Sequence, residues 1–383
     1  MSLVEEYRRI DALLEARARD HPRRVEPTWS DLLAAIDGVA DRLRAEAGKA
    51  EPRELPAFYD RPVFVVGHRK TGTTLLLDLL DGHPQLVVLP GESNHFLTFL
   101  PRFGGHEPER IAAEAQRWWI LRLISPSGIP PFWAAGRPGQ SDPYARFTEE
   151  LLALATPGRD TLGLAAVALH AATGATGEPR AWVEKTPGQE HCLDQILGVY
   201  PEARFVHLVR DPRSVAAAIS RLDRILGQDT DLVGVGMTLS RSFEAAERNA
   251  RRLGEQRYLV LRYEDMVATP EPAMRRVADF ARIDRADSLL TPTVGGVEAR
   301  SNSAWTARQV TGQIESSRLD LWSEELDDHA AELIAASARR AAARYYELPR
   351  PGALASAEVA SRRVRLAVGS RVQKKIFSSG FSA

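Results

Sequence analysis

Apolar positions along the chain follow two alternating patterns. Short runs rich in β-branched and aromatic residues have the length of strands buried on both faces, and they occupy residues 63–66, 86–89, 181–185, 203–209 and 258–261. Between them, apolar residues recur at helical spacing over longer stretches, as from Thr73 to Leu80. Buried strands that alternate with helices predict an α/β fold, with a central parallel sheet of about five strands flanked by helices.

Residues 1–60 carry a different pattern. Two stretches place their apolar side chains on one helical face each, the first around Tyr7 and the second around Leu32. These stripes indicate two amphipathic helices that pack on the rest of the chain, with a surface for a partner as the alternative. We therefore expect a helical N-terminal extension before an α/β domain of residues 61–348.

A glycine-containing loop joins the first strand to its helix. Gly67 and Gly72 allow the backbone to curl so that its N–H groups point inward, and the N-terminus of the helix adds partial positive charge. Side-chain donors add to this field at Lys70, Thr71, Thr73 and Thr74. The loop therefore predicts a site for an anion of phosphate size.

This loop departs from the signature of nucleoside-triphosphate sites, G-x-x-x-x-G-K-[ST]. Thr73 stands where that signature has its lysine, and the lysine of this loop lies earlier, at Lys70. A triphosphate site also needs an acidic metal ligand at the end of another strand, and the sequence offers no convincing one. We expect a phosphate-like group that is held without a metal ion.

The loop from Gly67 to Leu76 resembles the 5′-phosphosulfate loop of the sulfotransferases that use 3′-phosphoadenosine-5′-phosphosulfate (PAPS). Three later stretches resemble the rest of that family's pattern, namely residues 183–187 (VEKTP), 203–213 (ARFVHLVRDPR) and 261–266 (LRYEDM). The order and spacing of four motifs are more specific than any one of them. The resemblance implies a P-loop-like three-layer α/β fold and the transfer of a sulfuryl group from PAPS. A nucleotide kinase and an inactive binder of adenosine 3′,5′-bisphosphate are the alternatives.

The resemblance also assigns the two ends of the nucleotide to different parts of the chain. The 5′-phosphosulfate would lie on Arg69, Lys70, Thr71, Gly72, Thr73 and Thr74. The 3′-phosphate would lie on Arg210 at the end of the fourth strand, with Arg213 nearby. The family has a serine eight residues after this arginine, where this chain has Ala218, so Ser220 is the substitute considered. Relatives close the pocket with a basic loop, for which Arg308 is the candidate.

Candidate catalytic residues follow the second and third strands. Glu92 and His95 come after the second strand and Lys185 ends the third, at the edge where open α/β sheets bind their ligands. Branches of the family use either a glutamate or a histidine as the base. We expect Glu92 to be the base, with His95 as the alternative, and with capping of a helix that starts near Asn94 as a structural role for Glu92. Lys70 would stabilise charge on the bridging oxygen as the nucleotide leaves.

Composition narrows the expected partners. The 383 residues include 50 basic and 51 acidic ones, so no global charge favours nucleic acid, a membrane or acidic peptides. The expected acceptor is a hydroxyl or amine of a carbohydrate, lipid or other small molecule rather than a protein tyrosine. Cys192 is the only cysteine, which excludes an intramolecular disulfide. The sequence has no signal-peptide pattern, so we expect a cytoplasmic protein.

Two segments carry no catalytic motif. Residues 107–180 contain a long loop rich in proline and glycine, which we interpret as a lid or a wall of the acceptor pocket, with a packed surface loop as the alternative. The tail of residues 349–383 is basic, and apolar residues recur every four positions from Val364 to Ile376, which predicts an amphipathic helix. We expect a solvated or self-packed tail, with contact to an acidic membrane surface or a partner as the alternative.

Overall fold

The structure is a computed structural model of the chain. It describes residues 54–105, 159–173, 177–225, 227–299, 311–316, 319 and 322–365, together with single positions between 110 and 154. The helices expected before residue 54 and the proline-rich loop expected to be a lid lie outside the described residues.

Five parallel strands form the central sheet. In chain order they are β1 (Pro62–Val66), β2 (Leu86–Val88), β3 (Ala181–Lys185), β4 (Arg204–Val209) and β5 (Tyr258–Arg262). Their order across the sheet is β2-β3-β1-β4-β5, and every pairing is parallel. The apolar runs thus predicted all five strands, each end to within one residue.

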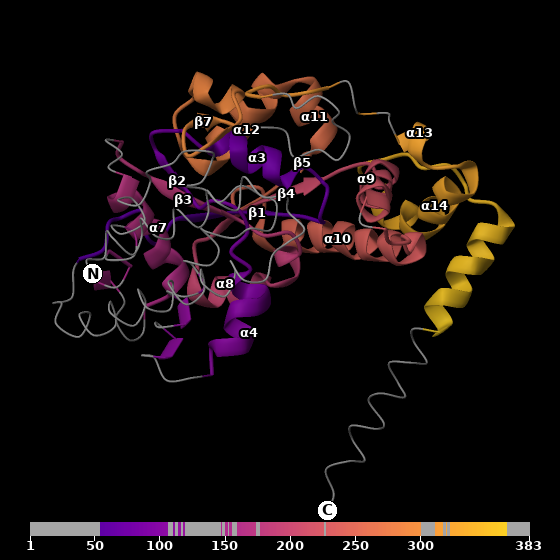
Figure 1. Cartoon of the computed structure of the whole chain (residues 1–383), viewed down its shortest axis with the longest axis horizontal. Coiled ribbons are helices and arrows are strands. Elements are labelled where there is room, and N and C mark those ends of the chain that lie inside the picture. Colours follow the sequence, from indigo (N-terminus) through magenta and orange to yellow (C-terminus); the bar gives the residue numbers. More distant parts are fainter. Residues whose placement is uncertain are drawn as a thin grey trace, which may run out of the picture.

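Helices cover both faces of this sheet (Figure 1). One face carries α3 (Thr73–Leu80), α11 (Tyr263–Ala268) and α12 (Pro270–Ala281), and the other carries α7 (Thr161–Thr173), α8 (Leu193–Val199) and α10 (Leu232–Leu253). Successive side chains of a strand point to opposite faces. Val63 and Val65 of β1 accordingly pack with α3 and α12, while Phe64 and Val66 pack with α7 and α8. The predicted three-layer α/β fold is confirmed.

A second group of helices extends the layer that contains α10. It consists of α9 (Pro212–Ile225), α13 (Trp322–Glu325) and α14 (Asp328–Ala342), which share an apolar cluster with α10. The helix of residues 353–365 packs against α10 and α14 through Ala355 and Val359. Nη2 of Arg362 in this helix lies 2.8 Å from Oδ2 of Asp231, the N-cap of α10. The described start of the basic tail is therefore packed on the protein.

The helix of residues 353–365 does not pack on the protein through the apolar stripe seen in the sequence. Val364, the first residue of that stripe, is 62% exposed. Ala355 and Val359 make the contact instead, because they lie on the side that meets Val233 and Leu333. The stripe beyond Val364 lies outside the described residues.

Short elements complete the described chain. After β2 come η1 (His95–Phe99), which is a π-helical turn, and α4 (Leu100–Phe103), and after β3 comes η2 (Gln189–His191). After α12 come η3 (Asp287–Leu290) and the antiparallel pair β6 (Thr293–Val294) and β7 (Val297–Glu298). No helix in the described ranges is long and apolar enough to cross a membrane.

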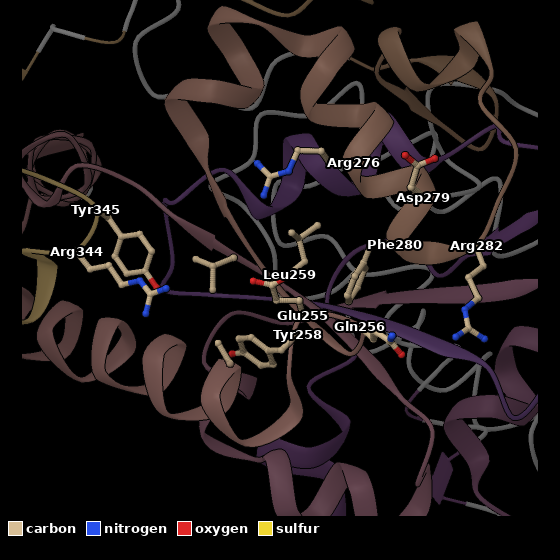
Figure 2. Close-up of a pocket in the computed structure, with 12 residues that line it drawn as sticks. Glu255, Gln256, Tyr258, Leu259, Arg276, Asp279, Phe280, Arg282, Arg344 and Tyr345 are labelled. Carbon is tan, nitrogen blue, oxygen red and sulfur yellow. The ribbon is translucent and has the colours of Figure 1, made fainter.

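A hollow of about 600 Å³ lies beside β5, an edge strand of the sheet (Figure 2). Leu259 and Val260 of β5 line it together with Arg276 and Phe280 of α12 and with Tyr345, which follows α14. None of its lining residues belongs to the loops that leave the strands at their carboxyl ends. The hollow is therefore separate from the loops at which the sequence places the candidate active site.

Candidate active site

The phosphate loop, residues 67–72, connects β1 to α3. Three of its residues have a positive φ, namely Gly67 at 138°, Lys70 at 69° and Gly72 at 99°. Gly72 is the N-cap of α3, within the described residues no side chain caps this helix end, and its first turn has no acidic residue. The amide groups at the start of α3 are therefore left for an external acceptor, as an anion site requires.

Both loop glycines are required by close contacts. A Cβ on Gly67 would lie 2.5 Å from the carbonyl oxygen of Leu208 on β4, and a Cβ on Gly72 would lie 2.3 Å from the ring of Tyr263 on α11. The backbone of Leu208 cannot retreat easily, because this residue is fully buried. Gly72 also has a left-handed φ, which a residue with a Cβ rarely adopts. The loop is thus held tightly against strand β4 and the start of helix α11.

A buried carboxylate holds the start of the loop. Glu190 Oε2 accepts a hydrogen bond from Gly67 N (3.2 Å), and Glu190 Oε1 accepts one from Ser242 Oγ (2.6 Å). Ser242 Oγ pairs with His207 Nε2 (3.3 Å), and His207 Nδ1 pairs with Tyr258 OH (2.8 Å). Burial opposes ionisation of Glu190, yet His207 and the bond from Ser242 hold its pKa below the usual range. Burial lowers the pKa of His207 to about 4.

The donors of the phosphate loop differ in their surroundings. Arg69 is exposed, and Thr73 is buried at the first position of α3. Thr71 Oγ1 donates to the carbonyl oxygen of His68 (2.7 Å), so its hydroxyl braces the loop. The pKa of the Lys70 amine is lowered by burial first and then by the nearby charge of Arg69. An anion bound at the loop would stabilise the protonated amine of Lys70 and so raise this pKa again.

Lys185 links the start of α3 to the loop after β2. It ends β3, its side chain is 1% exposed, and its Nζ lies 3.2 Å from Thr74 Oγ1 and 3.0 Å from Glu92 Oε1. One buried ammonium therefore contacts both the first turn of α3 and a candidate base. Asp78, one turn further along α3, has its pKa raised to about 8 by burial, with Lys185 acting to lower it.

The loop after β2 is bonded to the end of β3 at successive residues. Glu184 Oε1 accepts hydrogen bonds from Ser93 Oγ (2.5 Å) and Ser93 N (3.2 Å). Thr186 Oγ1 accepts a hydrogen bond from Asn94 N (3.0 Å). Together with the contact of Lys185, these bonds fix three consecutive residues of the loop on three consecutive residues of the VEKTP motif.

Glu92 does not act as a helix cap. The helical turn that follows it begins at His95 with Asn94 as its N-cap, at φ 50°; the side chain of Asn94 does not cap the turn, and His95 N donates to Ser93 Oγ (3.2 Å). The backbone thus places Asn94 rather than Glu92 at the N-cap position of this turn. The Glu92 side chain is 36% exposed and contacts Lys185, so it lies between a buried cation and solvent.

His95, the alternative base, is part of a buried polar group. It is 1% exposed, its Nε2 lies 3.0 Å from Asp160 Oδ1, and its ring stacks on Phe99. Tyr200 OH donates to the other oxygen of Asp160. Burial would raise the pKa of Asp160, but His95 and Tyr200 hold it below the usual range. Of the two candidates, Glu92 is the one that reaches solvent.

Arg210 follows β4 and lies against the phosphate loop. Its Nη1 donates to the carbonyl oxygen of Lys70 (3.2 Å), and its guanidinium lies 4.2 Å from the centre of the Tyr263 ring. The same ring lies against Gly72. Arg210 Nε is buried and has no hydrogen-bond partner among the described residues. A guanidinium held on two sides with an unsatisfied donor suits an anion beside the loop.

Arg213 is engaged within the protein. The carboxylate of Asp211 accepts hydrogen bonds from its Nε (3.1 Å) and Nη2 (2.7 Å), and its guanidinium lies 4.1 Å from the centre of the Trp322 ring. Asp211 N donates to Glu264 Oε1 (2.9 Å), so Glu264 braces the turn that carries both arginines. Binding of the 3′-phosphate by Arg213 would have to compete with Asp211.

The remaining expected ligands stay predictions. Ser220 is half-buried on α9, two residues beyond the buried Ala218. Arg308 lies outside the described residues.

Sequence motifs did not identify three residues that hold the site together. Ser93 bonds to Glu184, Glu190 bonds to Gly67 N, and Tyr263 lies between Gly72 and Arg210. Each acts through a contact between segments far apart in the chain, which spacing within a motif does not reveal. Their one signal in the sequence is that each lies within or next to a motif.

Comparison with known proteins identifies the family to which the chain belongs. The chain matches the model of the Sulfotransferase family over residues 62–287, more than half of its length. The omega-hydroxy-beta-dihydromenaquinone-9 sulfotransferase Stf3 of Mycobacterium bovis is 24% identical over 253 residues, which are 57% of this chain and 62% of that protein. The protein-tyrosine sulfotransferase of Drosophila melanogaster is 25% identical over 243 residues, which are 62% of this chain and 40% of that protein.

A solved structure gives a further match. The sulfotransferase domain from the olefin synthase of Synechococcus PCC 7002 is 22% identical, with a TM-score of 0.46, and the match covers 79% of this chain and 100% of that one. The matched part of this chain spans less than two thirds of each of the two relatives named above. The family match extends from β1 through the phosphate loop, the VEKTP motif and Arg210 to the end of α12 and into η3. The chain belongs to the sulfotransferase family.

Proposed function

We propose that this chain transfers a sulfuryl group from PAPS to a hydroxyl or amine of an acceptor and releases adenosine 3′,5′-bisphosphate. The position of Lys185 carries this proposal. Its Nζ lies between Thr74 in the first turn of α3 (3.2 Å) and the carboxylate of Glu92 (3.0 Å). One cation thus connects an anion site to a group that can take a proton, and sulfuryl transfer to a hydroxyl requires both.

The residues of the site fit the donor. The start of α3 offers uncapped amides without an acidic side chain in the first turn, and the amines of Lys70 and Lys185 lie close by. Arg210 lies across the loop, where the family resemblance places the 3′-phosphate, and its Nε has no hydrogen-bond partner in the part of the chain that the structure describes. Such a set of cations and N–H groups suits a ligand with phosphate groups at both ends.

Glu92 accepts the acceptor's proton in the proposed reaction while the acceptor oxygen attacks sulfur. The new oxygen–sulfur bond forms as the bond from sulfur to the bridging oxygen breaks, and that electron pair passes to the 5′-phosphate of the leaving nucleotide. Lys70, Lys185 and the loop amides stabilise the charge that develops on this oxygen. The proton remains on Glu92 until it is released to solvent, so the step needs no covalent intermediate.

The acceptor is proposed by class. The names of the two relatives given above specify a hydroxylated menaquinone in one case and protein tyrosine in the other. The balance of 50 basic and 51 acidic residues provides no general attraction for acidic peptides, which favours a carbohydrate, lipid or other small-molecule acceptor for this chain.

Calorimetry tests the donor. The titrants are adenosine 3′,5′-bisphosphate and ATP, each with and without magnesium. We expect the bisphosphate to bind more tightly than ATP, with an affinity that does not depend on magnesium. A preference for magnesium-ATP would instead support a nucleotide kinase and overturn the proposal.

Transfer is tested with radiolabelled PAPS and a panel of acceptors that contains a phenol, an oligosaccharide and a long-chain alcohol. We expect a labelled product from at least one of them. If the chain binds the bisphosphate but transfers label to none of these acceptors, it is a binding module rather than an enzyme of this class.

A further inference from the structure

The end of β3 is bonded to the loop after β2 from both faces of the sheet. Trp182 packs in the cluster on the α7 side, and Val183 packs in the cluster on the α3 side. Because side chains alternate along a strand, Glu184 lies on the α7 side and Lys185 on the α3 side. The loop that carries Glu92 passes over this strand end and is held by one ionisable residue from each face.

Ser93, the residue after Glu92, is fixed at every polar group. It is 2% exposed, and both its N and its Oγ donate to Glu184 Oε1, at 3.2 and 2.5 Å. Its Oγ also accepts a hydrogen bond from His95 N (3.2 Å), and its carbonyl oxygen accepts one from Trp118 Nε1 (2.8 Å). The backbone at Ser93 therefore has little freedom to move, and neither does the Cα of Glu92 next to it.

Glu184 is the centre of these bonds. Its side chain is fully buried, and its Oε1 accepts a third hydrogen bond from Thr186 Oγ1 (2.6 Å). Thr186 Oγ1 in turn accepts the bond from Asn94 N. Glu184 therefore controls two consecutive residues of the loop, one directly and one through Thr186. Asn94 has a left-handed backbone at φ 50°, a conformation that needs such support.

We infer that Glu184 is a positioning residue, which holds the loop so that the carboxylate of Glu92 stays at hydrogen-bonding distance from Lys185 and from an acceptor. This inference rests on the proposed role of Glu92 as the base. Glu184 itself is buried and does not reach the acceptor. A shift of about 1 Å in a reacting group can lower a rate about a hundredfold, so the position of a base on a loop must be maintained by its neighbours.

Ser93→Ala tests this with little change in volume. The variant loses the two hydrogen bonds of Oγ but keeps the bond from Ser93 N to Glu184. We expect kcat for the best acceptor of the panel to fall roughly tenfold to a hundredfold, while the Kd of adenosine 3′,5′-bisphosphate stays within about twofold of the parent. Parent-like turnover, or a parallel loss of bisphosphate binding, would overturn the inference.

Ser337→Ala is the matched control. Ser337 is also a buried serine, at 3% exposure, and its Oγ has no hydrogen-bond partner among the described residues. It lies on α14, which contributes no residue to the site. The control should keep the parent's kcat and Kd. If it lost as much activity as Ser93→Ala, the effect would be a general one of removing a buried hydroxyl.

A double-mutant cycle with Glu92→Gln separates positioning from general damage. Once Gln occupies position 92 there is no base to position, so Ser93→Ala should change the residual rate less than about twofold. An equal loss in both backgrounds would show that Ser93 acts independently of Glu92 and would sink the inference. A fully active Glu92→Gln variant would instead remove the proposed base, and with it the reason for this role of Glu184.

Glu184 itself is tested with two substitutions. Glu184→Gln keeps an oxygen that can accept from Ser93 and Thr186, whereas Glu184→Ala keeps none. We expect the Gln variant to retain at least about tenfold more kcat than the Ala variant at equal bisphosphate affinity. Equal losses in two folded variants would mean that these hydrogen bonds do not set the rate.

Discussion

Lys185 Nζ and Glu92 Oε1 lie 3.0 Å apart, although 93 residues separate them in the sequence. The two partners differ in exposure, since the Lys185 side chain is 1% exposed and that of Glu92 is 36% exposed. The carboxylate can therefore receive an acceptor's proton from the solvent side while the ammonium stays in place behind it. Glu92 and Lys185 together form the part of the site on which the proposed reaction depends most.

Glu92→Gln should keep donor binding and lose turnover. The amide preserves the shape and can still accept a hydrogen bond from Lys185, but it cannot take a proton, so we expect kcat to fall by roughly 10²–10⁴. His95→Asn is the comparison, because His95 is bonded to Asp160 within the protein. Rates and bisphosphate affinities of both variants give the answer. An active Glu92→Gln beside an inactive His95→Asn would make the histidine the base.

Lys70→Ala should lower kcat by about 10²–10³, since the loss of one donor to a developing charge costs ~2.7–4 kcal/mol. Lys70→Gly removes the same amine but suits the backbone better, because residue 70 has a φ of 69°. We expect equal losses of activity in the two variants, with the Gly variant about 1 kcal/mol more stable to urea than the Ala variant. Near-normal transfer by either would exclude Lys70 from the mechanism.

Arg210→Ala should weaken binding of adenosine 3′,5′-bisphosphate by roughly 1.5–3 kcal/mol, the value of a hydrogen bond to a charged group. Arg213→Ala is the control, because the guanidinium of Arg213 is already bonded to Asp211 and stacked on Trp322. Its effect on calorimetric affinity should be smaller. If Arg213→Ala were the more damaging change, the 3′-phosphate would lie on Arg213 instead.

His207 should make the protein less stable in mild acid. Its pKa is lowered by burial to about 4, whereas an unfolded chain binds this proton near pH 6.5. Between these values the unfolded state binds more protons than the folded state, so the free energy of unfolding falls as the pH is lowered. The loss reaches about 3 kcal/mol by pH 4. Urea unfolding from pH 7 to pH 4 measures it.

The reference for that measurement is His207→Gln, which cannot titrate. Other carboxyl groups contribute to acid sensitivity in both proteins, so the difference between the two curves reports His207 together with Glu190, whose pKa it lowers. We expect the parent to lose more stability than the variant across this range. Parallel curves would mean that folded and unfolded chains titrate alike at His207.

Local patterns were sufficient for most of the fold. An apolar, β-branched run such as Val63–Val66 has few alternatives to a buried strand, and Gly72 before an apolar stretch marks where α3 begins. Arg210 was located in the same way, because it directly follows a run of this kind. These features depend on residues that are neighbours in the sequence.

Bonds between distant segments were not predictable in the same way. Nothing in the sequence near His95 indicates that its ring pairs with Asp160. Nothing near Glu190 indicates that its carboxylate accepts a hydrogen bond from Gly67 N. Both are polar side chains that become buried because a partner from another loop satisfies them. The choice between Glu92 and His95 as the base depends on such partners, so the sequence left both open.

The central place of β1 determines when the proposed nucleotide could bind during folding. Pro62 pairs with Trp182, which is made 120 residues later, and Gly67 lies against Leu208 of β4, which is made later still. Closing such long loops costs entropy before any contact is gained, which makes a parallel sheet of this kind slow to form. A chain still on the ribosome has the whole phosphate loop long before it has the residues that shape it. Nucleotide added during synthesis or refolding should therefore bind only after the sheet is complete, and it should slow unfolding without accelerating folding.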